Sequence, residues 1–111
     1  QMAEKPTEIA LTEGVYYILL SLGEPRHGYG IMQNVETLSS GRVRLAAGTL
    51  YGALTTLLER EWIRALEEEP ETRRKDYEIT PKGRAVLLGE ITRLKELYEN
   101  GLKVTEGWQH D

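Results

Sequence analysis

Apolar residues recur at helical spacing in four stretches of the chain, and two of them lie in its N-terminal third. The stretch from Val15 to Leu22 follows Thr12, whose side chain suits a helix N-cap, and a Gly-Glu-Pro turn closes it. A second helix is predicted to begin near His27, with an apolar face made of Ile31, Met32, Val35 and Leu38. The sequence therefore opens with two helices separated by a tight turn.

The other two helical stretches differ in length. The third helix is predicted from Ala47 to Arg60, with one apolar stripe made of Leu50, Leu54, Leu57 and Leu58. The fourth begins at Thr80-Pro81, where threonine can cap and proline occupies a position whose N–H would have no helical partner. It is long, and its steps of four and three are close to a coiled-coil seam, made of Leu87, Ile91, Leu94 and Tyr98.

Three short segments alternate polar and apolar residues as strands do. Residues 42–45 suit a very short strand, and residues 62–66 and 77–79 flank a charged turn, which predicts a hairpin with a long tip. The order helix, helix, strand, helix, hairpin, helix is that of a winged helix. We therefore expect a mainly α fold with a small β-hairpin: a winged helix-turn-helix domain over residues 8–80, a long C-terminal dimerisation helix over 81–104, and flexible termini at 1–7 and 105–111.

Composition limits the alternatives. A chain of 111 residues with 40% hydrophobic and 29% charged residues fits one globular domain. Because it has no cysteine, disulfides and cysteine-based zinc sites are excluded, and we expect neither a metal nor a cofactor. The longest apolar stretch is too short for a membrane span and the first residues lack a signal-peptide core, so a cytoplasmic protein without a membrane partner is expected.

The net charge of −4 and the pI of about 5.3 argue at first against a nucleic-acid partner. The distribution changes that picture. Residues 42–84 hold nine Lys and Arg against eight Asp and Glu, so the acidity lies mainly on the flanks. The third helix and the hairpin are therefore not acidic as a unit.

An enzyme is not expected. The chain has two histidines and no cysteine, and the three glutamates at 67–69 lie in a solvated turn crowded with neighbouring charge, which does not favour a catalytic role. Gly28-Tyr29-Gly30 resembles a phosphate loop, but no Gly-Lys-Ser/Thr follows, so a tight turn into a helix is the favoured interpretation.

The third helix is the best candidate for chemistry. A helix that enters the major groove needs a first turn without bulk, and Gly48, Thr49 and Gly52 supply one. The hydroxyl of Tyr51 suits a phosphate, and Tyr29 is assigned to the same DNA-binding surface. Two alternatives stay open: Thr49 caps the helix only, and Tyr51 only packs.

The hairpin tip carries three adjacent cations, Arg73, Arg74 and Lys75. Charge on a loop is usually only solvated. At a wing beside a recognition-type helix, the same run predicts contact with DNA phosphates or the minor groove.

The seam of the fourth helix leaves apolar surface uncovered once the winged-helix core is complete. Folding back on its own core is the simplest alternative, but a two-fold dimer also covers it. The expected dimerisation residues are therefore Leu87, Ile91, Leu94 and Tyr98, with Val15, Ile18 and Leu19 of the first helix. An aromatic cavity for a small aromatic or cationic effector, lined by Tyr17, Tyr98 and Trp108, is a weaker expectation, because such residues more often belong to a core or a tail.

Three motifs are weak alone and fairly specific together: His27-Gly28-Tyr29-Gly30-Ile31, Gly48-Thr49-Leu50-Tyr51, and Arg73 to Tyr77 leading into Ile79 to Arg84. In this combination the chain resembles the PadR family of bacterial transcriptional regulators over about residues 11–98. The resemblance implies a homodimer that binds an inverted-repeat operator in double-stranded DNA and usually represses transcription, sometimes until a small aromatic or cationic compound binds. It also implies a recognition helix over 48–60 and a wing over 66–77.

The chain departs from the family pattern at two positions. Ala47 stands where proline or serine is common, and Gly52 stands where proline is common. The departures predict a looser entry into the recognition helix. Two rival functions remain: a winged helix used only for protein contacts, and a small-molecule sensor without DNA binding.

Overall fold

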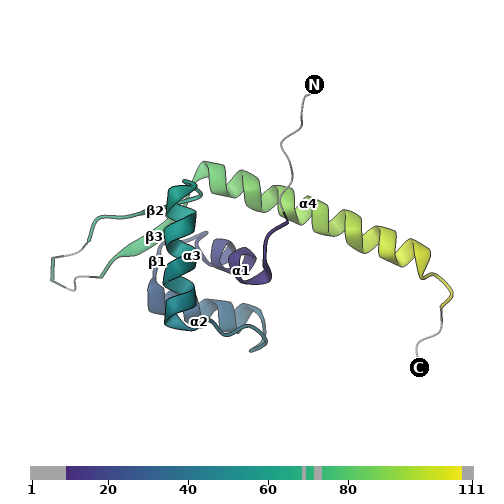
Figure 1. Cartoon of the computed structure of the whole chain (residues 1–111), viewed down its shortest axis with the longest axis horizontal. Coiled ribbons are helices and arrows are strands. Elements are labelled where there is room, and N and C mark those ends of the chain that lie inside the picture. The colour runs from purple at the N-terminus through teal and green to yellow at the C-terminus, as the bar shows by residue number, and fades with distance from the viewer. Residues whose placement is uncertain (1–9, 69, 72–73, 109–111) are drawn as a thin grey trace, which may run out of the picture.

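The computed structural model describes residues 10–68, 70–71 and 74–108. It contains four helices and three strands among these residues (Figure 1), in the order α1 (Glu13–Ser21), β1 (Arg26–His27), α2 (Gly28–Leu38), α3 (Ala47–Glu59), β2 (Ile63–Ala65), β3 (Asp76–Ile79) and α4 (Pro81–Val104). The four helices confirm the mainly α fold, and β2 and β3 confirm the hairpin. Of the predicted flexible termini at 1–7 and 105–111, residues 1–7 and 109–111 lie outside the described residues.

The sheet has the order β1-β3-β2, and both pairings are antiparallel. Ile63 faces Ile79 across the hairpin, and Arg26 faces Tyr77 on the other side of β3. The predicted strand at residues 42–45 is wrong. Its alternation is real, because Val43 and Leu45 pack against the core, but its backbone meets the Ser39 side chain instead of a neighbouring strand.

Twelve side chains form one core, and they come from the first three helices, from β2 and β3, and from the residues directly after α1 and before β2: Ile18, Leu19, Leu22, Ile31, Val35, Leu50, Leu54, Leu57, Trp62, Ile63, Tyr77 and Ile79. Burying an aliphatic side chain of this size stabilises a fold by about 1.5–3 kcal/mol. Leu58 is a correction to the predicted stripe, because it is 37% exposed while Leu57 is buried. One face of α3 therefore belongs to the core, and the rest of the helix faces outward.

Local chemistry sets the helix ends as expected. The hydroxyl oxygens of Thr12 and Thr80 accept hydrogen bonds from the backbone N–H groups of Val15 and Gly83 at 3.2 and 3.0 Å. Helix α2 ends where Ser40 and Gly41 take positive φ values of 55° and 80°.

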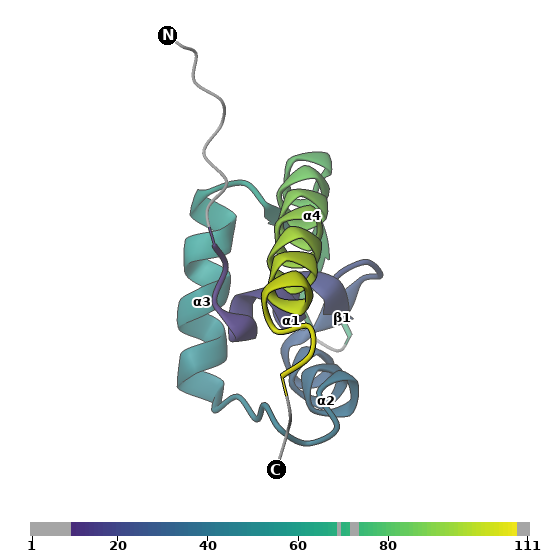
Figure 2. The same cartoon turned by 90° about the vertical axis from the view of Figure 1, so that its right-hand side faces the viewer.

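The long helix α4 starts against the core and then leaves it. A Cβ added to Gly83 would lie 2.1 Å from the carbonyl oxygen of Trp62, so only glycine permits this close approach. Helix α4 also contacts α1, and its C-terminal half runs out beyond the other helices (Figure 1). Viewed nearly along α4, α3 stands to one side of it (Figure 2).

Within the described residues, no helix is both long enough and apolar enough to cross a membrane. The same residues contain no cluster of three or more His, Asp or Glu side chains suited to a metal ion.

Candidate nucleic-acid interface

The exposed surface at the start of helix α3 carries mainly small side chains. Leu50, Leu54 and Leu57 are buried, whereas Gly48, Thr49, Tyr51 and Gly52 are exposed. A Cβ added to Gly48 or Gly52 would meet no atom within 4 Å, so the surface around both glycines is open. Helix α3 begins at Ala47 without a side-chain cap, and the looser entry predicted from Ala47 and Gly52 stays a prediction.

Thr49 does not cap α3. The N-cap position belongs to Ala46, which places Thr49 at the third residue of the helix. The alternative that Thr49 only caps the helix is thereby removed. Further along the same helix, the hydroxyls of Thr55 and Thr56 donate to the backbone oxygens of Tyr51 and Gly52, so they are already engaged.

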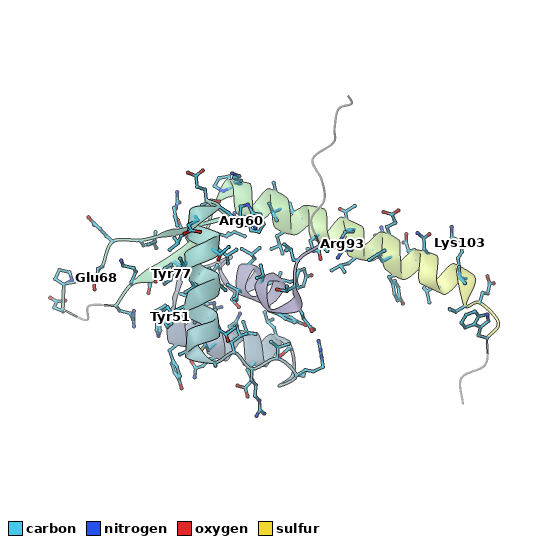
Figure 3. All side chains as sticks on the ribbon, viewed as in Figure 1. Tyr51, Arg60, Glu68, Tyr77, Arg93 and Lys103 are labelled. Carbon is cyan, nitrogen blue, oxygen red and sulfur yellow. The ribbon has the colours of Figure 1, made fainter. Side chains whose placement is uncertain are left out.

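Tyr51 packs and is exposed at the same time. Its side chain is 48% exposed, yet a Cβ added to Gly28 would lie 2.1 Å from its hydroxyl oxygen. The absent side chain of Gly28 therefore makes room for Tyr51 at the start of α2. Burial raises the pKa of Tyr77 above its usual value of 10.0, and the nearby Tyr51 adds to that rise. Figure 3 labels both tyrosines, on α3 and on the adjoining sheet.

Tyr29 directly follows the glycine that Tyr51 contacts, and it is 60% exposed. The structure thus brings the start of α2 and the first half of α3 together, and each of these segments carries one exposed tyrosine.

The wing is partly neutralised by its own acids. The guanidinium Nε of Arg74 lies 3.6 Å from the Asp76 carboxylate, and the Arg64 Nε donates to Glu78 at 2.7 Å. Lys75 is exposed beside them. The predicted contact at Arg73 lies outside the described residues.

Sequence reasoning missed two arginines in the segment that enters α3. Arg44 is 73% exposed and lies 3.3 Å from Glu36, and Arg42 pairs with Glu13, which lowers the pKa of that carboxyl. Both were assigned to a strand. The usable signal was their position, because two cations directly before a recognition-type helix lie near the same groove.

The predicted dimerisation residues divide into two groups. Ile18 and Leu19 are buried in the core of the single chain, so they have no surface to offer a second copy, and Val15 and Leu87 are partly buried against that core. On α4, the remaining predicted residues are 39–67% exposed: Ile91, Leu94 and Tyr98.

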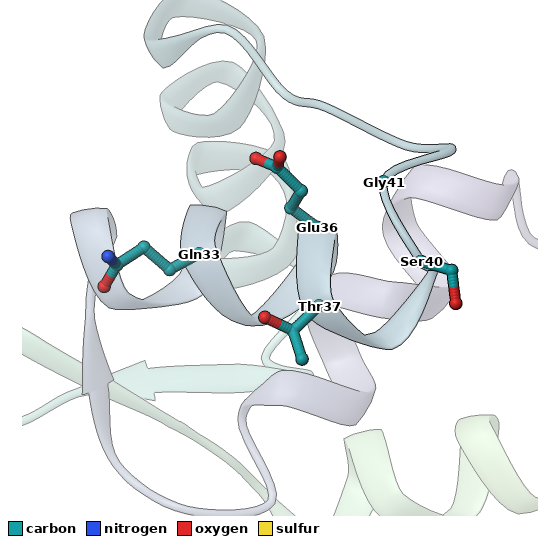
Figure 4. Close-up of a pocket in the computed structure, with 5 residues that line it drawn as sticks. All are labelled: Gln33, Glu36, Thr37, Ser40 and Gly41. Carbon is teal, nitrogen blue, oxygen red and sulfur yellow. The ribbon is translucent and has the colours of Figure 1, made fainter.

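The predicted effector residues are not gathered in the single chain. Tyr17 lines a cavity between α1 and α4 of about 370 Å³, together with Leu11, Glu13, Tyr16, Glu90, Arg93 and Leu94. Tyr98 and Trp108 do not line it and are 67% and 63% exposed. A second hollow, at the end of α2, is open and polar and lacks aromatic residues (Figure 4).

Comparison with known proteins identifies the relatives of this chain. Residues 15–88 match the family described as transcriptional regulator PadR-like. An uncharacterized 37.1 kDa protein in a transposon of Streptomyces fradiae is 37% identical over 81 residues, which make up 72% of this chain and 22% of that protein. The chain thus spans about a fifth of the length of that relative.

Solved structures agree with the fold. A PadR-like transcription factor from Bacteroides fragilis is 29% identical with a TM-score of 0.67, covering 82% of this chain and 87% of that one. A PadR family transcriptional regulator from Eggerthella lenta is 24% identical with a TM-score of 0.69, covering 84% of this chain and 81% of that one.

Proposed function

The chain belongs to the PadR-like family of transcriptional regulators, which are not enzymes, and on that premise we propose that it is a homodimeric repressor that binds an inverted-repeat operator. The observation that carries the proposal is the exposed face at the start of α3, where small and hydroxyl-bearing side chains lie opposite the buried Leu50, Leu54 and Leu57. Such a helix can lie deep in the major groove with its Thr49 hydroxyl at base edges.

The remaining contacts in this proposal go to the DNA backbone. Tyr29 and Tyr51 offer phenol hydroxyls at the start of the groove-facing surface, and Arg44 lies in the segment that leads into it. Arg73, Arg74 and Lys75 hold flanking phosphates from the wing. DNA as the ligand supports the expected cytoplasmic location.

The dimer in this proposal forms through α4. Its exposed apolar residues are numerous for a surface helix. On the half that leaves the body they are Leu94, Leu97, Tyr98, Leu102 and Val104, and Ile91 lies just before that half. A second copy covers them by two-fold symmetry and presents two α3 helices to one face of the duplex. Ile18 and Leu19 are left out of the interface because the core already buries them.

A small aromatic or cationic effector would bind in the cavity beside Tyr17 at the α1–α4 junction. Two tyrosine rings meet there edge-on, with centroids 5.7 Å apart, and offer flat apolar surface to such a ligand. Occupation of this cavity would release the operator by changing how α4 is held.

Selection from a random duplex pool tests the central proposal. We expect enriched fragments with two inverted half-sites whose centres lie about one helical turn of ~10 base pairs apart, or a small multiple of it. The Thr49→Ala variant should accept more bases at one position of each half-site, at a cost of about 1–3 kcal/mol, while Thr92→Ala on α4 should match the wild type.

Other outcomes would contradict the proposed DNA-binding function. A protein that stays monomeric, enriches no sequence and shows negligible affinity for duplex DNA at low salt would be a protein-interaction module, as its acidic pI of about 5.3 would favour. Melting raised by a ligand without any operator binding would instead indicate a sensor. Repression itself is tested by placing the selected operator in front of a reporter gene, whose transcription should fall.

A further inference from the structure

Helix α4 is joined to the rest of the molecule through its first half only. Gly83 lies against Trp62, Val86 and Leu87 pack on the core, and every residue from 94 to 104 is exposed. The helix therefore leaves the body at the turn formed by Glu90 and Arg93 (Figure 3, which labels Arg93).

A buried carboxylate holds this exit point. Glu90 is 4% exposed, and within the described part of the chain it is the one buried charged residue. Its two oxygens accept hydrogen bonds from Nε and Nη2 of Arg93, both at 2.8 Å, and Oε2 also accepts the backbone N–H of Leu11 at 3.3 Å. The Arg93 guanidinium lowers the pKa of this carboxyl, so it is ionised at neutral pH.

The contact with Leu11 joins two distant parts of the chain, and the two contacts with Arg93, which lie within α4, hold the Glu90 carboxylate in place for it. Leu11 belongs to the segment that leads into α1, which contacts α2 as well as α4. The cavity of about 370 Å³ lies directly beside Glu90 and Arg93, so side chains do not completely fill the junction. The direction of α4 therefore depends on the polar contacts of Glu90 more than it would in a close-packed junction.

We propose that Glu90 is a positioning residue, which fixes the angle between α4 and the DNA-binding body and thereby sets the half-site spacing that the dimer accepts. This inference rests on the proposed function, because it requires that α4 forms the dimer and that α3 meets DNA.

A small change in the angle between α4 and the DNA-binding body has a large effect on the position of the α3 helices in the dimer. The eleven exposed residues from 94 to 104 form an arm of about 16 Å, and a change of ~10° at its base moves its end by about 3 Å. One base pair rises ~3.4 Å along the duplex. A small loss of angular definition in both copies is thus enough to shift the two α3 helices by about one base pair.

The first test measures geometry without DNA. Because the chain has no cysteine, a single Glu59→Cys substitution at the exposed end of α3 carries one spin label per copy. Electron-spin distance measurements should give one narrow inter-copy distance, which Glu90→Gln should broaden or shift and the exposed control Glu96→Gln should not. An unchanged distribution in Glu90→Gln overturns the inference.

The second test uses DNA, with the two selected half-sites separated by zero to several additional base pairs. Wild type should prefer one spacing, and Glu90→Gln should reduce the ratio between best and neighbouring spacings by about tenfold while its affinity for a single half-site stays unchanged. Should Glu90→Gln fail to fold, Arg93→Lys, which keeps the charge and loses the two-pronged contact, replaces it in both tests. A spacing preference that survives in both variants overturns the inference alone, whereas wild type that is monomeric or ignores DNA overturns the proposed function as well.

Discussion

Helices α3 and α4 are both amphipathic, but their exposed faces have opposite chemistry. On α3 the exposed residues around Thr49 are glycines and hydroxyl-bearing side chains, while on α4 the exposed residues include bulky leucines. A polar surface without bulk costs little in water and fits a polar groove. A run of exposed leucines costs about 25 cal/mol per Å² of apolar surface until another protein covers it. The comparison shows that a single chain can carry one face for DNA and another for its own copy.

The strongest way to break this comparison is to place a charge on the apolar face of α4. Tyr98→Glu should give a monomer, since a carboxylate would be buried in the dimer without a partner. A lone copy meets only one half-site, so we expect operator affinity to fall by at least about 100-fold. Sedimentation and operator titration measure the two effects.

A matched control tests the side of the helix rather than the charge. At 100° per residue, Thr92 lies on the polar side of α4, away from the seam of Ile91, Leu94 and Tyr98. Thr92→Glu should therefore remain dimeric and bind the operator as the wild type does. Equal losses in both variants would mean that α4 is not an interface with two distinct sides.

Two glycine-to-alanine variants test the difference between α3 and α4 through their effects on stability and operator binding. Gly83→Ala at the base of α4 should cost about 2 kcal/mol, because the new Cβ meets the backbone oxygen of Trp62 at 2.1 Å and neither element can yield. Gly28→Ala meets only the end of the Tyr51 side chain, which can rotate away. It should cost less stability but weaken operator binding, because Tyr51 leaves its place.

Urea unfolding and operator titration of the two alanine variants provide the measurement. The expected pattern is a stability loss at Gly83 and a larger binding loss per unit of stability at Gly28. The reverse pattern would contradict the idea that the Gly28–Tyr51 contact belongs to the DNA surface and the Gly83–Trp62 contact to the core.

Local signals in the sequence were enough to predict most helices. Thr12 and Thr80 act as caps because capping depends on residues three positions away, and the bounds of α3 follow from its own leucine spacing. The strand at Arg26–His27 was not predicted, because two residues carry no alternation and pair only when β3 comes near. The alternation of polar and apolar residues at 42–45 correctly predicted that Val43 and Leu45 face the core. It did not predict a strand correctly, because a strand also needs a backbone partner.

The candidate site was predicted less completely than the fold. The exposed surface around Thr49 follows from the spacing of one helix. The packing of Tyr51 over Gly28 does not, because the two residues lie on different helices and meet only through the angle between them. The same reason hid the contact between Glu90 and Leu11, which are 79 residues apart in the sequence.

A change of pH tests the contribution of the buried Glu90 charge of α4 to stability. The folded pKa of Glu90 lies below its usual value of 4.5, so this group stabilises the fold above pH 4.5 and the contribution is lost as the pH falls through the folded pKa. Glu90→Gln should therefore be less stable than wild type by about 1.5 kcal/mol at neutral pH, and the difference should shrink in acid, below pH 4.5. Urea unfolding at both pH values measures it, and a constant difference would mean that the ionised form is not what stabilises the junction.

The smallest expected effect concerns the wing, where the charge of Arg74 is already shared with Asp76 at 3.6 Å. Arg74→Ala should weaken binding to all DNA sequences alike, and the slope of log affinity against log salt should become shallower by about 0.9, the value for one lost phosphate contact. Lys103→Ala on the polar side of α4 removes the same charge far from the wing and should leave that slope unchanged. If the two variants gave equal slopes, the wing would act through net charge alone. The hairpin would then not belong to the DNA-binding surface that α3 presents.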